Sequence, residues 1–398
     1  MRVERPADAW LAEGVRSPFG KFGGALHHTS LIDLGAQVVE AALDRAGWPS
    51  DQLDELDVGI GMIEAGFMVP ARLIAMKAGL GETLPSLTID RACCSGAATV
   101  GAAARALASG ADSVMCLGVE TLSRTPFLLH EARWGRRLGG PYIEDLLLMQ
   151  SPLTGTSIAR YVGEVALEHG VTRSDQDEWA LRSHQRYFTA LEAGVFDDEI
   201  VPVQIDAGEL KSDEHPRRDT SLEALAALPT VRDSPTITAG NAPGLNDGAC
   251  ALIVATEARA AANDVNPIAR IVSYLQTAGA PTSSAYLPGL AIIELAGEAG
   301  LAVADLDVIE INEAYAATPL VSVRRMADGD PGLEKELLSR TNRNGGAVAI
   351  GHPIGASGAR LLLTAARELA RSEGRWAAVA ICGGFGQTDA LLLERVDG

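Results

Sequence analysis

Cysteine is scarce in this sequence. Only 5 cysteines occur among 398 residues; they are scattered, their number is odd and no Cys-x-x-Cys pair is present. This pattern argues against a disulfide framework and against a structural zinc site, and it favours a reducing compartment, so we expect a cytoplasmic protein. The first ten residues contain early acidic side chains and no apolar core, so they lack the features of a signal peptide.

Basic residues are also in short supply. Lys and Arg total 33 against 52 Asp and Glu, which gives a formal net charge of −19. A nucleic-acid-binding protein needs a basic face for the phosphates, so this class of function is excluded. This net charge is still compatible with a local basic pocket that binds a small anionic ligand.

Long apolar runs are missing as well. The longest uncharged stretch, residues 271–293, contains Pro281 and Pro288 together with Gly279 and Gly289. Residues that interrupt regular structure at this density favour a loop over a membrane span, so we expect no membrane-inserted segment.

What is present is typical of a large α/β protein. The hydrophobic share of 47% is enough for a sizeable core, and the length suggests two or three domains. Short apolar runs without clean alternation are separated by Ala-rich helical patterns, as expected for buried strands covered by helices. Predicted strands are 56–62, 113–118, 306–311 and 377–382, and predicted helices are 96–109, 174–193 and 358–371.

An internal repeat supports a duplicated architecture. Several features follow one another from Ala46 to Cys116. They are an Ala-Gly pair, a Leu-Asp pair, an apolar run, a Ser-Gly pair that opens an Ala-rich helix, and a strand with a cysteine. The same order recurs from Ala299 to Cys382. Chance recurrence is the alternative in a sequence so rich in Ala and Gly. Four landmarks in one order favour duplication.

The segment between the two copies breaks the pattern. It is richer in charge and is interpreted as a lobe inserted on a loop, a common place for substrate-binding residues. We therefore expect an N-terminal half made of residues 1–121 and 238–262, an inserted lobe at 122–237, and a C-terminal half at 263–398.

Cys93 is the first candidate for chemistry. It follows an apolar run and directly precedes the Ser-Gly pair that opens a predicted helix. The positive end of a helix dipole stabilises a thiolate, so we expect a lowered pKa and a nucleophilic sulfur. The alternative is a small buried hydrophobe, the role we assign to its neighbour Cys94.

His352, Cys382 and Asn312 are further candidates. His352 lies in a Gly-rich turn before a helix, where it could accept a thiol proton or donate to an oxyanion; a hydrogen-bonded turn histidine is the alternative. Cys382 ends a predicted strand and is followed by glycines whose N–H groups are free to form an oxyanion hole. Asn312 and Glu313 also end a strand, where they could instead cap the next helix.

Together these motifs resemble those of the thiolase family. The family pattern C-x-S-G corresponds to residues 93–96, N-E-A-F to 312–315, the Gly-rich G-H-P-x-G-x-S-G region to 345–358, and C-x-G-x-G to 382–386. Further matches begin at Arg16, Gly118, Asp213 and Thr238, so the resemblance spans nearly the whole chain. It implies a duplicated, five-layered α/β/α/β/α fold with an inserted loop lobe that binds coenzyme A.

The resemblance also implies the roles of the site residues. Thiolases make or cleave a carbon–carbon bond beside a coenzyme A thioester, through an acyl-cysteine intermediate. Cys93 would take the acyl group, His352 would accept its proton, and Cys382 would be the second acid/base. Asn312 would hold a water for one oxyanion hole with His352, and the N–H groups of Cys93 and Gly384 would form the other. No metal or redox cofactor is implied.

Coenzyme A would be the substrate that the arginines bind. The resemblance assigns Arg217 to the adenine nucleotide, and Ala242 and Pro243 to the pantetheine arm. Pro243 stands where many members have a serine that bonds the pantetheine, so this hydrogen bond is lost if the loop is placed alike. Other lobe arginines, whose alternative role is solvated surface or a subunit contact, are Arg133, Arg136, Arg137 and Arg218.

Further departures concern the acyl side of the site. Residues 154–160 read TGTSIAR where the family has a substrate-side histidine, Asp90 replaces an asparagine and Tyr315 a phenylalanine. These changes affect the expected substrate more than the expected reaction.

Two alternatives remain beside an active thiolase of fatty-acid metabolism and β-oxidation. They are a Claisen-type ketoacyl synthase of the same superfamily and a non-catalytic acyl-CoA-binding scaffold subunit. Cys382 together with Asn312 argues against the synthase, and the intact motifs argue against the scaffold. The resemblance also implies a homodimer or homotetramer.

Overall fold

The computed structural model describes residues 2–62, 67–135, 138–140, 142–148, 151 and 155–396. Its elements in chain order are β1 (Arg2–Glu4), β2 (Trp10–Arg16), β3 (Gly20–Lys21), α1 (Leu31–Ala46), η1 (Ser50–Gln52), β4 (Glu55–Gly59), α2 (Pro70–Lys77), β5 (Ser86–Ile89), α3 (Ser95–Ala108), β6 (Ser113–Thr121), η2 (Leu122–Arg124), β7 (Phe127–His130), β8 (Tyr142–Asp145), η3 (Leu146–Leu148), α4 (Ile158–Glu168), α5 (Arg173–Glu192), β9 (Val203–Ile205), β10 (Gly208–Leu210), α6 (Leu222–Ala226), β11 (Asn246–Ala255), α7 (Glu257–Ala262), β12 (Ala269–Ala278), η4 (Pro281–Ala285), α8 (Leu287–Glu298), η5 (Val303–Asp305), β13 (Val308–Ile311), α9 (Ala317–Ala327), α10 (Pro331–Arg340), α11 (Ala347–Ile350), α12 (Ile354–Ser372), β14 (Trp376–Gly383), η6 (Gly384–Gly386) and β15 (Gln387–Glu394).

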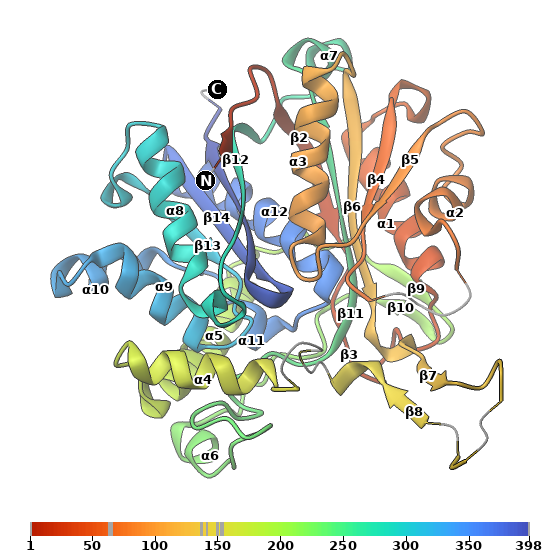
Figure 1. Ribbon diagram of the computed structural model, residues 1–398. Helices are drawn as coiled ribbons and strands as arrows, with labels where there is room; N and C mark the ends of the chain where they lie inside the picture. The colour runs from red at the N-terminus through yellow and green to blue at the C-terminus, as the bar shows by residue number, and fades with distance from the viewer. Residues whose placement is uncertain are drawn as a thin grey trace.

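Two half-sheets form the centre of the molecule (Figure 1). The strands of the large sheet follow the order β13-β14-β15-β12-β2-β11-β6-β4-β5, with β1 paired to β12 and β3 to β11. The two halves join where β12 meets β2, at Ala269 with Leu11 and Arg270 with Trp10, and where β1 pairs with β12. Strand β12 thus links the two half-sheets into one continuous sheet.

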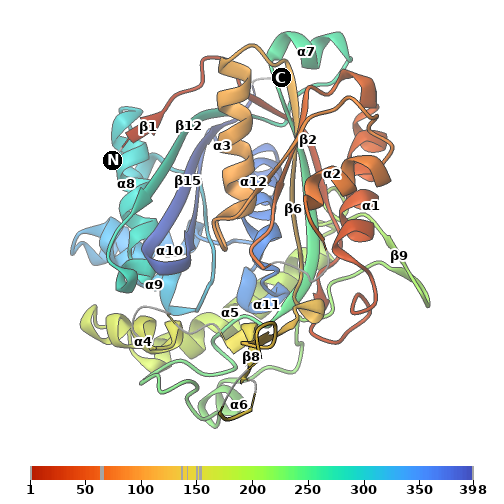
Figure 2. The same cartoon turned by 45° about the vertical axis from the view of Figure 1, so that its right-hand side comes forward.

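Helices alternate with these half-sheets as five layers. Helices α1 and α2 cover the outer face of the N-terminal half-sheet, α3 and α12 lie between the two half-sheets, and α8 and α9 cover the other outer face (Figures 1 and 2). Side chains on β6 alternate accordingly: Leu117 packs in the outer core with α1, whereas Cys116 packs in the central core with α3 and α12. The expected five-layered α/β fold is confirmed, and it explains why the strands are apolar on both faces.

The repeat seen in the sequence is repeated in the strand pairing. In the first copy β4 runs parallel to β6 with Asp57 opposite Cys116, and in the second β13 runs parallel to β14 with Glu310 opposite Val379. Because the two Leu-Asp landmarks align Asp57 with Glu310, Cys116 corresponds to Val379 and not to Cys382. The cysteines of the two copies therefore do not occupy equivalent positions, because Cys382 lies further along β14 than Val379.

Most expected elements are present, with shifts at their ends. The helix expected from Gly358 begins at Ile354, because Pro353 already starts the turn as its N-cap residue. The expectation of a loop at 271–293 is wrong: these residues form most of β12 and the beginning of α8. Pro288 is tolerated there because it lies in the first turn of α8, where its missing N–H has no partner to lose.

The lobe that follows β6 lies at the lower side of the molecule in Figure 1 and holds α4, α5, α6 and the β7–β8 hairpin. It packs under the ends of the strands and helices that carry the candidate residues. Among the described helices, none is both long and apolar enough to cross a membrane.

Candidate active site

Cys93 and His352 meet although 259 residues separate them. The Cys93 sulfur lies 3.2 Å from Nε2 of His352. Cys93 comes from the loop just before α3, and His352 from the turn before α12, so the packing of these two central helices brings them together. Glycines allow this approach: a Cβ at Gly96 would lie 2.5 Å from the Gly355 carbonyl oxygen.

The imidazole of His352 is fixed on its other side. Its Nδ1 lies 2.6 Å from the Ser357 hydroxyl oxygen. That hydroxyl donates its proton to the Pro353 carbonyl at 2.9 Å, so its oxygen accepts from Nδ1–H. The N–H of His352 donates to Asn246 Oδ1 at 3.0 Å, which anchors the backbone. This arrangement leaves Nε2 as the acceptor that faces Cys93.

Burial makes the resting pair neutral. Burial, followed by the charge of Arg360, lowers the pKa of His352 from 6.5 to about 4. Burial, followed by the charges of Cys382 and Glu120, raises the pKa of the Cys93 thiol well above its ordinary range. The expected lowering of this pKa by the helix N-terminus is wrong, because removal from water outweighs the backbone N–H that favours the thiolate.

Cys382 lies near the carboxyl end of β14, opposite Thr388 of β15. It is buried, and burial raises its pKa to about 12. The next residues touch the Cys93 loop: a Cβ at Gly383 would lie 2.8 Å from the Cys94 sulfur, and one at Gly384 would lie 3.4 Å from Ala92 Cβ. The structure thus places Gly384 beside the loop that carries Cys93.

Asn312 follows β13, and its N–H donates to the Ala380 carbonyl at 3.0 Å. Its side chain is fully buried, yet neither Oδ1 nor Nδ2 finds a hydrogen-bond partner among the described residues. Buried amides nearly always have partners. An unpartnered donor and acceptor at this place suit a water or a substrate oxygen.

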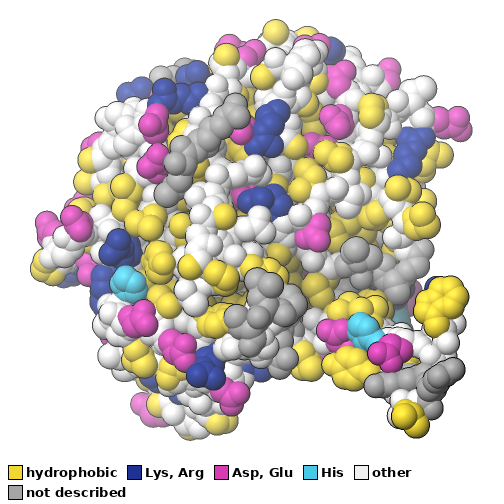
Figure 3. Space-filling model, viewed as in Figure 1, with side chains coloured by type: hydrophobic (Ala, Val, Ile, Leu, Met, Phe, Trp, Pro, Cys, Tyr) yellow, Lys and Arg dark blue, Asp and Glu magenta, His cyan; other side chains and the backbone are white. Residues whose placement is uncertain are grey.

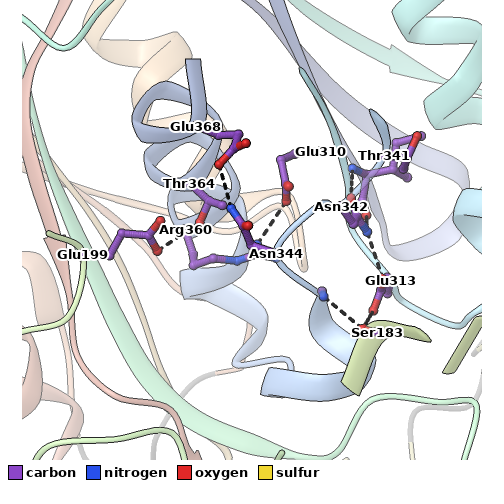
Figure 4. Close-up of polar contacts among 12 residues, drawn as sticks. Ser183, Glu199, Glu310, Glu313, Thr341, Asn342, Asn344, Arg360, Thr364 and Glu368 are labelled. Atoms are coloured by element: carbon purple, nitrogen blue, oxygen red, sulfur yellow. Dashed lines mark hydrogen bonds and ion pairs between the residues drawn. The ribbon is translucent and has the colours of Figure 1, made fainter. Parts of the chain in front are cut away.

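Glu313 is the hub of a buried polar network (Figure 4). Its carboxylate accepts from Trp179 Nε1 at 2.8 Å and from the Ser183 hydroxyl at 2.9 Å, both on α5. It also accepts from Asn342 Nδ2 at 3.0 Å and from the Val348 N–H at 2.9 Å, on the segment that leads to His352. Glu313 therefore joins the inserted lobe to the histidine turn and does not merely cap a helix.

Glu120 makes a second connection, between the two halves. Its carboxylate accepts from the N–H groups of Gly355 and Gly61, each at 2.9 Å. Gly355 lies in the first turn of α12, three residues after His352. Glu120 thus fixes the histidine turn to the carboxyl ends of β4 and β6.

The residues expected to contact coenzyme A lie on neighbouring segments. The N–H of Arg217 donates to His184 Nδ1 at 3.2 Å, and its side chain is exposed. A Cβ at Gly244 would lie 2.5 Å from the His215 ring, so the Arg217 loop packs on the turn after Pro243. Ala242 packs against the apolar cluster that includes Tyr315.

The other lobe arginines do not gather there. Arg218 pairs with Glu192 at 2.7 Å and covers the Phe188 ring, and Arg133 is exposed. Arg136 and Arg137 lie outside the described residues, as does Thr154 at the start of the divergent TGTSIAR stretch.

The two remaining departures have local explanations. Asp90 Oδ1 accepts the Ala92 N–H at 2.9 Å, a contact that an asparagine oxygen would make equally well. Burial, followed by the charges of Cys93 and Cys382, raises the pKa of the Tyr315 phenol.

Sequence reasoning missed the residues that orient the reactive groups. Ser357, Asn246 and Glu120 all lie in stretches that carried the family resemblance, and this was the only signal. The partners of Asn246 and Glu120 are distant in sequence, so no local pattern could reveal those contacts, whereas the partners of Ser357 lie within five residues of it. Among the residues that the structure describes, no three His, Cys, Asp or Glu side chains gather as they would around a metal ion.

Comparison with known proteins agrees with this geometry. Residues 9–258 match the family described as thiolase, N-terminal domain, and residues 265–395 match thiolase, C-terminal domain. The chain is 39% identical to an acetyl-CoA acetyltransferase of Escherichia coli, over 97% of this chain and 99% of that protein. It is also 39% identical to a beta-ketoadipyl-CoA thiolase of Pseudomonas putida, over 98% and 100%.

Solved structures give the same result. Human mitochondrial 3-ketoacyl-CoA thiolase in complex with CoA superposes with a TM-score of 0.93 at 33% identity, covering 98% of each chain. The acetyl-CoA acetyltransferase of Bacillus anthracis superposes with a TM-score of 0.92 at 33% identity, covering 98% of this chain and 100% of that one.

Proposed function

The chain belongs to the thiolase family and is an acyltransferase acting on coenzyme A thioesters, and from this premise we propose that Cys93 carries the acyl group. The main support is the distance of 3.2 Å between Cys93 Sγ and His352 Nε2. A nucleophile needs a base within hydrogen-bond reach that is itself held by a third group, and Ser357 is that group.

In the direction of cleavage, the Cys93 sulfur attacks the 3-keto carbon while its proton moves to Nε2 of His352. The neutral state of both groups suits this step, because the His352 imidazole is unprotonated at neutral pH and can accept the thiol proton. The bond between the second and third carbons then breaks, and its electron pair becomes the enolate of acetyl-CoA.

Cys382 donates its proton to that enolate carbon and releases acetyl-CoA. Its thiolate next takes the proton of the incoming coenzyme A thiol, whose sulfur attacks the acyl-Cys93 carbonyl. His352 returns its proton to the departing Cys93 sulfur. Every proton is thus accounted for, and synthesis is the same sequence in reverse.

Two oxyanion positions would stabilise the charged oxygens. Asn312, through a bound water, and His352 would serve one of them; the unpartnered and buried amide of Asn312 supports this. The N–H groups of Cys93 and Gly384 would serve the other. Each preorganised donor of this kind typically contributes about 3 kcal/mol.

Coenzyme A would enter along the lobe, with Arg217 on the nucleotide and the Ala242–Pro243 turn on the pantetheine. The backbone supports this path, because the Ala316 N–H donates to the Asn241 carbonyl at 2.9 Å and holds the turn beside the 312–315 motif. The same proposal divides the chain into residues 1–121 with 238–262, the CoA-binding lobe 122–237, and residues 263–398.

We further propose a role in fatty-acid breakdown in the cytoplasm. The likeness to a 3-ketoacyl-CoA thiolase supports the first part. All five cysteines are free thiols, which fits a reducing compartment.

A homo-oligomer completes the proposal. Among the described strands, β5 ends the sheet; Leu87 on it is 45% exposed, and Met68 and Val69 before α2 are 83% and 64% exposed. An unpaired edge next to an apolar surface suits a two-fold contact with a second copy. The β7–β8 hairpin, whose hydrophobic side chains are visible in Figure 3, offers a second contact for a tetramer.

The test is thiolysis of acetoacetyl-CoA by coenzyme A, followed through loss of the enolate absorbance of the magnesium-chelated substrate. We expect wild-type protein to catalyse it and Cys93→Ala to abolish it, with Cys116→Ala as a control on a buried thiol. Unchanged turnover in Cys93→Ala would remove the nucleophile from the proposal. Condensing activity without thiolysis would indicate the ketoacyl synthase, and binding without turnover the scaffold subunit.

A further inference from the structure

The loop that carries Cys93 has an unusual backbone. Ala92, directly before the nucleophile, has a φ of 51°, in the left-handed region that a residue with a Cβ rarely adopts. The Ser95 hydroxyl donates to the Ala92 carbonyl at 2.6 Å, and the Arg91 N–H donates to the Ser95 oxygen at 2.8 Å. Such a conformation persists only where the surroundings impose it.

The side chain of Arg91 is one of these surroundings. Its Nη2 lies 2.7 Å from Asp389 Oδ1, and its Nη1 donates to Gln387 Oε1 at 2.7 Å. Asp389 is fully buried in β15, and the Tyr274 hydroxyl donates to its other oxygen at 2.7 Å. Arg91 belongs to the N-terminal half, whereas Asp389, Gln387 and Tyr274 belong to the C-terminal half.

These partners lie next to Cys382. In the pairing of β14 with β15, Ile381 faces Asp389 and Cys382 faces Thr388. The Cys94 thiol donates to the Ile381 carbonyl at 3.2 Å, so the residue after Cys93 is docked on the same stretch of β14. The Cys93 loop is therefore attached to β14, which carries Cys382, and to the neighbouring β15.

We propose that the Arg91–Asp389 ion pair positions Cys93 against Cys382, and so acts on the carbon–carbon step in particular. This inference rests on the roles proposed above for the two cysteines. Arg91 is a positioning residue: it acts through the geometry of the loop. Its planar guanidinium bonds Asp389 through both Nη2 and Nε and Gln387 through Nη1, which sets an orientation that a lysine ammonium cannot reproduce.

Two reactions of the same enzyme can distinguish a specific effect on the position of Cys93 against Cys382 from a general loss of activity. Exchange of free coenzyme A into acetyl-CoA needs only Cys93 and His352: the proton moves from Cys93 to His352 and then to the departing thiolate. Thiolysis of acetoacetyl-CoA also needs Cys382. An enzyme whose Cys93 loop is slightly displaced should therefore retain coenzyme A exchange and lose thiolysis.

The experiment measures both rates and the thermal unfolding of the full-length protein. For Arg91→Lys we expect thiolysis to fall by about tenfold or more, as for a small misplacement of reacting groups, and exchange to fall by less than about threefold. Tyr274→Phe, which keeps the ion pair but removes one contact to Asp389, should shift the ratio in the same direction by a smaller factor.

Arg367→Lys is the matched control. Arg367 of α12 also joins the halves, through its ion pair with Glu13 of β2, but it lies in the part of α12 that is far from His352. It should leave the ratio of the two rates unchanged. Equal losses of exchange and thiolysis in Arg91→Lys, or no loss of either, would overturn the inference. If Arg91→Lys does not fold, an unchanged ratio in Tyr274→Phe would overturn it. Wild-type protein that performs neither reaction would instead refute the proposed function.

Discussion

The Ser357 hydroxyl oxygen lies 2.6 Å from Nδ1 of His352, on the side of the ring opposite Cys93. Because Ser357 donates its only proton to Pro353, it fixes both the tautomer and the orientation of the imidazole. A single hydroxyl in the first turn of α12 thus decides which ring nitrogen can accept the thiol proton.

Replacing Ser357 by alanine should release this constraint. We expect kcat/KM for thiolysis to fall by about tenfold, the value of one hydrogen bond of roughly 1.4 kcal/mol, with the fold intact. Ser357→Thr, which keeps the hydroxyl, is the matched control and should retain more activity than Ser357→Ala. Equal activity of the alanine variant and the wild type would show that the tautomer is fixed by other groups.

The acid limb of the pH–rate profile should lie unusually low. Because burial lowers the pKa of His352 from 6.5 to about 4, the imidazole stays an acceptor below pH 6. Measured kcat/KM at pH 5.5 should therefore show no loss from protonation of a histidine. An acid limb centred near pH 6.5 would contradict this. The same shift predicts that stability decreases as pH falls from about 6.5 to 4, since only the unfolded histidine binds a proton there.

Removing the charge of Glu313 should uncouple the lobe from the histidine turn. In Glu313→Gln, the new amide N–H₂ would face groups that all donate hydrogen bonds to the carboxylate of the wild type. We therefore expect the free energy of unfolding to fall by about 2–4 kcal/mol and kcat to decrease. Denaturant unfolding and thiolysis assays measure both. Glu178→Gln, an exposed change on α5, is the control. A variant as stable and as active as the wild type would refute the role of the network.

Asp57 should destabilise the protein at alkaline pH. It is buried, its Oδ1 has no partner among the described groups, and burial followed by the charge of Glu55 raises its pKa to about 7. Between about pH 4 and 7 the folded state binds this proton more tightly than the unfolded state, so stability falls as pH rises.

Asp57→Asn removes that titration. The variant should gain about 1–3 kcal/mol over the wild type at pH 8, and less at pH 5, where Asp57 is already neutral. Thermal unfolding at the two pH values measures the difference. A gain of the same size at both would indicate that the ionisation of Asp57 does not matter.

A charge on the exposed edge of the sheet should weaken the proposed oligomer. Leu87 on β5 is 45% exposed, and a lysine there would be trapped in a contact between two copies. We expect Leu87→Lys to reduce the mass measured by light scattering. Leu222→Lys, at a residue of 41% exposure on α6, should leave it unchanged. A wild type that is monomeric, or an unaffected Leu87→Lys, would exclude this contact.

The sequence predicted the α/β class because apolar runs and Ala-rich helical patterns are local features that can be recognised within short segments. It also identified Cys93, His352, Cys382 and Asn312 as candidates, since each stands beside glycines or at a strand end. Prediction failed where distant residues decide the outcome. The 271–293 stretch was expected to be a loop because its prolines were read without the buried surroundings that make it strand and helix.

What the sequence determined by itself was the family, the duplicated layers and the identity of the reactive groups. Only the tertiary structure decided their distances and their protonation. The thiol of Cys93 was expected to be acidic because it begins a helix, yet its pKa is raised because the packing of two halves removes it from water. Burial and long-range contacts such as that of Arg91 with Asp389 depend on residues hundreds of positions away, and no local pattern contains them.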